Sequence, residues 1–530
     1  MHFRSFRLVL IFFVSTFILF ANTVAGQDSV RLTVDVVANN APVTNLTKAD
    51  FSVQDSGKPR TIDGFEGPSS YPAKPPQLGP NEYTNAPDVS HSGAIFVVLD
   101  TIDTRYLDER DFREMILRFL GKASQAKHAV TLAIMDNNGL YVYHDYRSGP
   151  DVLQAALIKA GLGGMKGMTP PAGVNDAEVS AEAARLTAFS KGDHSNPAQQ
   201  EQLLRANLDQ PLFMLQDVAE AGWGLPGRKA LVWITNGIPF EINPKTFQFE
   251  SRRVQSNGVP VNGMQAGGVK PQLSADQVKR LVPIWRKSVH DLVYGGFAVY
   301  PVEAIGAATA GSYSFTIENM KILAQMTGGK SYVGKNDPFP ELLDISNGNT
   351  AGYVLTYKSD GATGTDYRPI DVTTKNASLT VNRPAGYFPL DIAKVKGSED
   401  VYAAIQSPLE YTGLIFKVAV GSIEAGSGGK KKVNLVISLA GDAGVLDEAA
   451  RKVDLGLVAV AKNAKGEQVG KLSEGAGGQF PPEAVSQIKE LGFQLKRAIE
   501  ITPGDCQVHF VIRDNQTGRI GSVIFPLKVQ

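Results

Sequence analysis

The chain has 530 residues, with 53 Lys plus Arg and 53 Asp plus Glu, so its formal net charge is zero. This length predicts several domains, at roughly 100–200 residues each. The balanced charge leaves no overall field that would attract nucleic acid, which argues against a nucleic-acid-binding role. Cys506 is the single cysteine, which excludes internal disulfides, multi-cysteine zinc sites and iron–sulfur clusters within the chain.

The N-terminus has the pattern of an export signal. Arg4 and Arg7 precede an apolar run from Leu8 to Ala21, and small residues follow up to Gly26. We therefore predict a signal peptide over residues 1–26 and an exported protein, periplasmic or extracellular. An uncleaved membrane anchor is the alternative. No later run is long and apolar enough to predict a membrane span after cleavage.

Two segments precede the main predicted domain. Residues 27–66 alternate apolar and polar side chains, beginning with VRLTVDVVA, and predict a small β unit. Residues 67–92 are rich in proline and carry little apolar periodicity, which predicts an extended linker.

Residues 93–350 alternate apolar strands with helical patterns. The first strand, AIFVVL, is apolar throughout and ends at Asp100, which is typical of a strand buried on both faces. The alternation predicts an α/β domain with a doubly wound, mainly parallel sheet. Ligands of such sheets bind at the carboxyl ends of the strands, where Asp100 and the sequence Thr235-Asn236-Gly237 would lie. Residues 163–205 and 241–275 have weak periodicity and predict long loops.

The remaining chain is rich in strand patterns. Residues 351–390 predict a β meander that completes the edge of the α/β domain. Residues 391–530 contain several alternating strands separated by turns, and they predict a C-terminal immunoglobulin-like β-sandwich without its disulfide.

Several stretches carry a family resemblance: VVLDTIDTRYLDERDF, GLPGRKALVWITNGIP, GFAVYPVEAIG, LAQMTGGKSY and NRPAGYFP. They make the core resemble a von Willebrand factor A-type domain, and the mature chain is similar to the exported bacterial VWFA-related family described mainly from acidobacteria. The resemblance implies an interaction module and says little about biochemical role, because one fold serves many functions.

In that family a metal-ion-dependent adhesion site holds Mg²⁺ through an Asp-x-Ser-x-Ser loop, a Thr and an Asp. Asp100 and Thr104 match the first loop, but Ile102 replaces its middle serine. Asn236 stands in place of the family's aspartate, which makes the site degenerate. The resemblance thus implies a Mg²⁺ site formed by a set of five residues. These are Asp100, Asp103, Thr104, Thr169 and Asn236.

A metal-free reading of Asp100 stays open, in which the carboxylate binds backbone amides of its own loop. Catalytic motifs are weak: Gly329-Lys330-Ser331 lacks the first glycine of a phosphate loop, and the histidines are scattered. We therefore expect a non-enzymatic, exported protein that binds a protein partner. The alternative is a purely structural envelope or matrix scaffold without metal-dependent binding.

Overall fold

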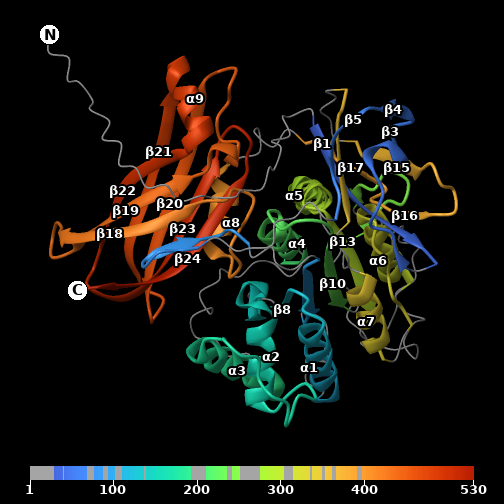
Figure 1. Cartoon of the computed structure of the whole chain (residues 1–530), viewed down its shortest axis with the longest axis horizontal. Coiled ribbons are helices and arrows are strands. Elements are labelled where there is room, and N and C mark those ends of the chain that lie inside the picture. The colour runs from blue at the N-terminus through green and yellow to red at the C-terminus, as the bar shows by residue number, and fades with distance from the viewer. Residues whose placement is uncertain are drawn as a thin grey trace.

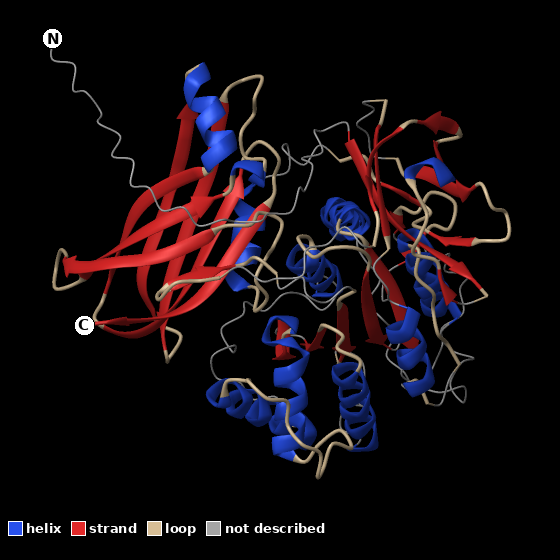
Figure 2. Cartoon of the chain, viewed as in Figure 1, coloured by secondary structure: helices blue, strands red, loops and turns tan. Residues whose placement is uncertain are grey.

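The computed structural model describes residues 29–39, 41–68, 77–87, 93–101, 110–136, 139–192, 210–235, 241–250, 275–303, 314–334, 337–348, 352–360, 366–390 and 397–530. The predicted signal peptide lies outside these residues. The described chain is a mixed α/β structure with several sheets, as the sequence predicts. A strand-rich C-terminal body lies on one side, and most of the helices lie on the other side (Figures 1 and 2).

A five-stranded sheet with strand order β13-β10-β7-β8-β9 forms the centre of the α/β domain. Strands β13, β10, β7 and β8 are parallel, and β9 runs antiparallel to β8. The strands are β7 (Ile95–Asp100), β8 (Val130–Asp136), β9 (Gly139–His144), β10 (Lys229–Thr235) and β13 (Phe297–Glu303), with the short pair β11 (Glu241–Ile242) and β12 (Phe249–Glu250) nearby.

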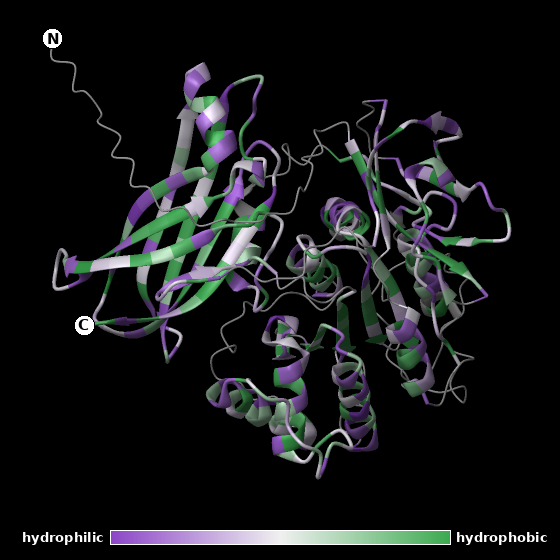
Figure 3. Ribbon diagram, in the orientation of Figure 1, coloured by the Kyte–Doolittle hydropathy of each residue, from purple (hydrophilic) through white to green (hydrophobic). Residues whose placement is uncertain are grey.

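Alternate residues of the central strands enter two separate hydrophobic cores. Val97 and Val232 pack with α1, α2, α3 and α7, whereas Phe96 and Trp233 pack with α4, α5 and α6. Helices therefore cover both faces of the sheet, and the residues of the central strands enter a core on each face. The green colour of these strands in Figure 3 shows their apolar character. The helices are α1 (Arg110–Gln125), α2 (Gly149–Ala160), α3 (Asp176–Lys191), α4 (Gln210–Gly222), α5 (Ala275–Tyr294), α6 (Ser314–Thr327) and α7 (Phe339–Gly348).

Helix α3 corrects the prediction of one long loop over residues 163–205. Asn175 caps its start by accepting hydrogen bonds from the amides of Ala177 and Glu178. Gly192, with φ of 73°, ends it in the left-handed conformation. Its buried side chains recur at helical spacing from Val179 to Phe189, so the sequence does carry a helix signal here.

The small N-terminal β unit and the meander of residues 351–390 form one structure, which differs from the prediction of a separate unit and a domain edge. Strand β1 pairs with β14, and β3 pairs with β15, across some 320 residues of sequence. The strands are β1 (Ser29–Ala38), β2 (Ala41–Pro42), β3 (Phe51–Asp55), β4 (Lys58–Arg60), β5 (Ile62–Glu66), β14 (Tyr353–Lys358), β15 (Arg368–Thr374), β16 (Thr380–Asn382) and β17 (Gly386–Tyr387).

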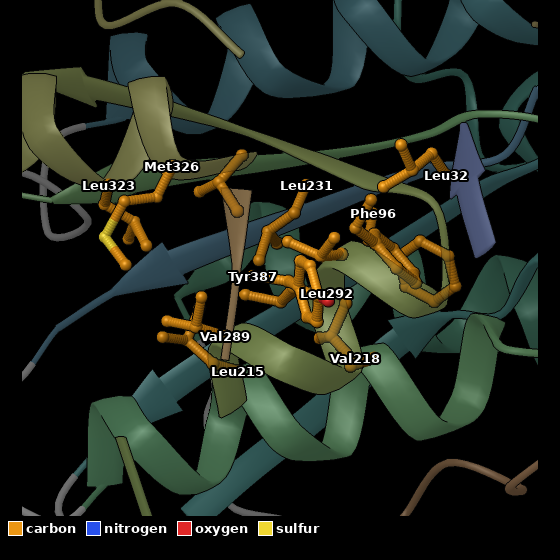
Figure 4. Close-up of a cluster of buried hydrophobic side chains, with 14 of the residues drawn as sticks. Leu32, Phe96, Leu215, Val218, Leu231, Val289, Leu292, Leu323, Met326 and Tyr387 are labelled. Carbon is orange, nitrogen blue, oxygen red and sulfur yellow. The ribbon is translucent and has the colours of Figure 1, made fainter. Parts of the chain in front are cut away.

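This N-terminal β structure shares its core with the α/β domain. Figure 4 shows Leu32 of β1 and Tyr387 of β17 in one cluster with Phe96, Leu231 and Leu292. Because the two parts bury apolar surface against each other, the β structure is fixed to the domain.

The C-terminal strands have the order β24-β23-β20-β21-β22-β19-β18-β6. Strands β20 to β23 lie in the spatial order β23-β20-β21-β22, which is a Greek-key arrangement. The elements are β6 (Glu82–Thr84), α8 (Gly397–Gln406), β18 (Lys417–Ala425), β19 (Lys431–Leu439), β20 (Lys452–Asn463), β21 (Gln468–Gln479), α9 (Pro482–Leu491), β22 (Phe493–Ile501), β23 (Gly504–Asp514) and β24 (Ile520–Val529).

Strand β6 comes from residues 67–92, which the sequence predicts to be only a linker. Its residues pair with β18, and the ring of Tyr83 stacks on Phe525 of β24 at a centroid distance of 4.7 Å. Strands β21 and β22 join at a single residue pair, Gly470 with Ile501. The eight strands thus form one continuous sheet that folds around one apolar core, whereas the sequence predicts an immunoglobulin-like sandwich. We call this folded sheet the C-terminal sandwich.

Candidate functional site

The carboxyl edge of the central sheet carries a row of polar side chains. Strands β7, β10 and β13 end at Asp100, Thr235 and Glu303, and Thr235 is the register partner of Glu303. The chain order of the strands reverses between β7 and β10, because β7 is followed by β8 on one side and lies beside β10 on the other. Such a switch point is where open α/β sheets bind ligands.

Asp100 and Thr235 contact each other directly. The Thr235 hydroxyl donates a hydrogen bond of 2.8 Å to Oδ2 of Asp100, and Thr235 and Asp100 are only 1% and 6% exposed. Next to them, the backbone N–H and the hydroxyl of Thr101 both donate to the carbonyl of Met135, at 2.9 and 3.0 Å. The start of the loop after β7 is therefore fixed to both neighbouring strands.

Glu303 is a member of this row that the sequence prediction missed. Its carboxylate accepts a hydrogen bond from the amide of Gly334, and its own N–H donates to the carbonyl of Tyr332 at 2.8 Å. The signal was present, since the apolar run of β13 ends at an acid in the same way as β7 ends at Asp100. Neighbouring strands lie about 4.8 Å apart, so Glu303 stands about 10 Å from Asp100 across β10.

Thr169 does not belong to this edge, and its proposed role as a ligand is a misassignment. It follows Met168, whose sulfur lies 3.6 Å from Nε2 of Gln125 at the C-terminal end of α1. That end of α1 leads directly into the start of β8, which is level with Ile95 at the start of β7. Asp100 lies at the other end of β7, about 17 Å away at 3.3 Å per residue.

Three of the five predicted ligands, Asp103, Thr104 and Asn236, lie outside the described residues. Of the five, the structure places only Asp100 at the carboxyl edge, together with Thr235. Within the described ranges, no group of three His, Cys, Asp or Glu side chains is arranged to hold a metal ion. The Asp100 carboxylate and the Thr235 hydroxyl are both hard oxygen donors, the kind of ligand that suits Mg²⁺. The hydrogen bond from Thr235 also orients the Asp100 carboxylate, as hydrogen-bond partners of metal ligands commonly do.

A second surface of interest is a cleft of about 730 Å³ between the α/β domain and the C-terminal sandwich. Arg147 lies in its wall, where its guanidinium pairs with Asp145 at 2.7 Å and also with Glu410. His144 and His509 line it as well: the ring Nδ1 of His144 lies 2.7 Å from Glu182, and that of His509 lies 3.2 Å from the carbonyl of Ile405. Burial lowers the pKa of His509 to about 4, so this ring is neutral at pH 7.

Cys506 also contributes to the wall of this cleft. It is half-buried, and burial raises the pKa of its thiol. A raised thiol pKa reduces the thiolate fraction, so this thiol is a weak nucleophile at neutral pH.

Comparisons with known proteins give no family assignment. No protein-family model and no curated protein matches the chain. Among solved structures, proximal thread matrix protein 1 from the mussel byssus matches 48% of this chain and 46% of its own length, at 12% identity and a TM-score of 0.23. The chain therefore spans about half of that protein.

Two bacterial structures are also similar. An aerotolerance-related membrane protein from Bacteroides fragilis matches 48% of this chain and 99% of its own, at 10% identity and a TM-score of 0.22. A von Willebrand factor type A protein from Catenulispora acidiphila matches 91% of this chain and 72% of its own, at 8% identity and a TM-score of 0.23. At TM-scores this low, all three proteins are weak structural neighbours.

One further finding concerns membranes. Among the described helices, none combines the length and the apolar character needed to cross a bilayer.

Proposed function

We propose that this chain is an exported, non-catalytic interaction protein whose α/β domain, a doubly wound domain of the von Willebrand factor A type, binds a protein partner at its carboxyl edge. The observation that carries the proposal is the buried hydrogen bond between Thr235 and Asp100 at the switch point of the sheet. Glu303 extends the same row, so the edge is acidic and its side chains are held in place before binding.

We further propose that Asp100 takes part in a degenerate Mg²⁺ site. Asp100 would be its carboxylate donor, and Asp103, Thr104 and Asn236 are the other candidate donors from the neighbouring loops. A bound Mg²⁺ would offer a coordination position to a carboxylate of the partner. The hydroxyl of Thr235 orients the carboxylate of Asp100, which supports such a role.

Calorimetry tests the metal proposal. Mg²⁺, Mn²⁺ and Ca²⁺ are titrated into the chelator-treated mature protein and into Asp100→Ala, with folding checked by circular dichroism. Asp371→Ala is the matched control, because Asp371 is exposed and lies on β15, in the N-terminal β structure. Saturable binding by the wild type and the control, but not by Asp100→Ala, supports the site. Identical titrations of all three proteins overturn it.

A separate experiment tests the partner-binding edge. Wild type, Asp100→Ala and Asp371→Ala are immobilised and exposed to the same envelope fraction, and the bound proteins are quantified. A protein retained by wild type and Asp371→Ala and lost by folded Asp100→Ala supports the edge as the binding face. If the three proteins retain the same set in the same amounts, the structural scaffold is the better description.

A further inference from the structure

The segment from Glu410 to Leu414 connects the α/β domain to the C-terminal sandwich. Towards the domain, Thr412 N–H donates to the carbonyl of Glu220 at 2.9 Å, and the Thr412 hydroxyl donates to the carbonyl of Ala221 at 2.7 Å. Towards the sandwich, the N–H of Leu414 donates to the carbonyl of Ile520 at 2.9 Å. The same few residues therefore bind both bodies, and we call this segment the connector.

A buried group of charges lies directly beneath the connector. The ammonium of Lys287 in α5 contacts Glu220 at 3.0 Å and Asp291 at 2.5 Å, and all three residues are less than 10% exposed. A methyl group added to Gly413 would stand 3.2 Å from Oε2 of Glu220, so the connector closes over this carboxylate. The single ammonium of Lys287 thus lies between the carboxylates of Glu220 and Asp291, and the contact between the α/β domain and the C-terminal sandwich covers them.

Burial, and not the nearest charge, favours protonation of this pair of acids. Asp400 of α8 adds a third negative charge, and its Oδ2 is buried without a hydrogen-bond partner among the described residues. Burial raises the pKa of Asp291 to about 7, although Lys287 opposes the shift, and burial also raises the pKa of Glu220. The other titratable or charged groups around the connector and α5 include Asp217, Tyr411, Arg513, His290, Tyr294, Arg31, and the ion pair of Glu410 with Arg147.

The neighbouring side chains of His290 and Tyr294 keep the same charge near neutral pH. Burial lowers the pKa of His290 to about 4, so its ring stays neutral, and burial raises the pKa of Tyr294 well above its ordinary value. Tyr411 donates its hydroxyl proton to Asp217 at 2.5 Å. The acids around Lys287 can therefore change charge at this contact. Glu410 in the connector is a further buried acid whose pKa is raised by burial against the opposing charge of Arg147, and Asp291→Asn separates its effect from that of the acids around Lys287.

We propose that the contact between the α/β domain and the C-terminal sandwich is a pH-sensitive clasp, closed while Glu220 and Asp291 share a proton beside Lys287 and loosened when both are ionised. In the loosened state water reaches the carboxylates, which removes the cost of a second buried negative charge. Residues 405–408, just before the connector, and Glu410 within it line the cleft of about 730 Å³, so loosening the clasp would also open that cleft.

The sign follows from proton binding. A carboxyl with a pKa of about 7 in the closed state and an ordinary value near 3.8 in the open state binds more protons when closed. Closing is therefore favoured at lower pH, and it weakens as pH rises from about 4 to 7 and then levels off. For these two values, the opening equilibrium constant increases about tenfold between pH 6 and pH 8.

Hydrogen exchange on the full mature chain tests the clasp. Peptides containing Thr412 and Gly224 are followed between pH 6 and 8, since the amides of both residues donate across the contact. Rates are corrected for intrinsic chemical exchange and compared with a peptide from the core strand β19. We expect opening at the clasp to increase about tenfold in the wild type and less than twofold in Asp291→Asn, whose amide cannot ionise.

The exposed Asp371→Asn serves as the control and should follow the wild type. Glu220→Gln replaces Asp291→Asn if circular dichroism shows that the latter is unfolded. Equal pH dependence in wild type and in the folded Asp291 or Glu220 variant would overturn the proposal, and so would the absence of any pH-dependent opening in the wild type.

Discussion

Nε of Arg228 lies 2.8 Å from Oδ2 of Asp35, at the contact between the α/β domain and strand β1. Arg228 precedes β10 and is 2% exposed, and it also donates to the carbonyls of Asn382 at 3.1 Å and Gly328 at 2.5 Å. One guanidinium thus joins four segments that are far apart in the sequence. Its role is to fix the N-terminal β structure on the domain.

Arg228→Met should lower the free energy of unfolding by about 3–5 kcal/mol at pH 7, because it leaves the Asp35 carboxylate buried without its cation. Asp35→Asn in the same chain should recover part of this loss. Urea unfolding followed by fluorescence measures both variants. A loss below about 1 kcal/mol for Arg228→Met would contradict the importance of this ion pair.

The same pair predicts a pH effect. Burial raises the pKa of Asp35 to about 6, although Arg228 opposes the shift. The folded state therefore binds more protons than the unfolded state between about pH 4 and 6, and stability from this group falls as pH rises through that window. Urea unfolding at pH 4.5 and 6.5 should show a smaller fall for Asp35→Asn than for wild type. Equal falls would indicate that Asp35 titrates normally.

Thr235→Val should destabilise the fold by about 1–3 kcal/mol, because it removes a hydrogen bond to the buried carboxylate of Asp100 while keeping the shape of the side chain. Thermal unfolding measures the effect. Thr380→Val is the matched control, since Thr380 is exposed, and it should change stability by less than about 0.5 kcal/mol. Equal effects of the two substitutions would mean that the Thr235 hydroxyl contributes nothing specific.

Lys229→Met should flatten the pH dependence of stability between pH 8 and 10. Lys229 is fully buried and donates to the carbonyl of Leu225 at 2.7 Å, and burial lowers its pKa well below the ordinary value. The unfolded chain binds more protons in this range, so wild-type stability rises with pH, by up to about 1.4 kcal/mol per pH unit. The exposed Lys58→Met should keep the wild-type slope, and a wild-type slope in Lys229→Met would refute the argument.

Gly329→Ala should destabilise the fold by about 1–3 kcal/mol or more, because the added methyl carbon would lie 1.9 Å from the carbonyl oxygen of Val299 in β13. Gly348→Ala is the control, since nothing lies within 4 Å of its added methyl. Thermal unfolding compares the two. The close packing of Gly329 also gives a structural reason for the glycine in Gly329-Lys330-Ser331, the sequence that resembles the end of a phosphate loop.

The sequence alone was sufficient for the parallel strands of the central sheet, because a buried parallel strand must be apolar throughout. It also located Asp100 at the end of the first such strand, since the apolar run stops there. The sequence prediction does not include β9 or the helices α2, α3 and α7. The pattern from Asn175 to Gly192 indicates helix α3, but its many small and polar residues weaken the periodic signal.

Only the tertiary structure decided which strands pair. The register of β1 with β14, and of β6 with β18, depends on contacts across more than 300 residues, and alternating side chains fit many partners equally well. The same limit applies to the site: the sequence could not show that Thr169 lies at the far end of the sheet from Asp100. Strand order places Thr235 beside Asp100, and Glu303 one strand further along the same edge. Spacing along the chain does not reveal such neighbours, because they are set by which strands pair.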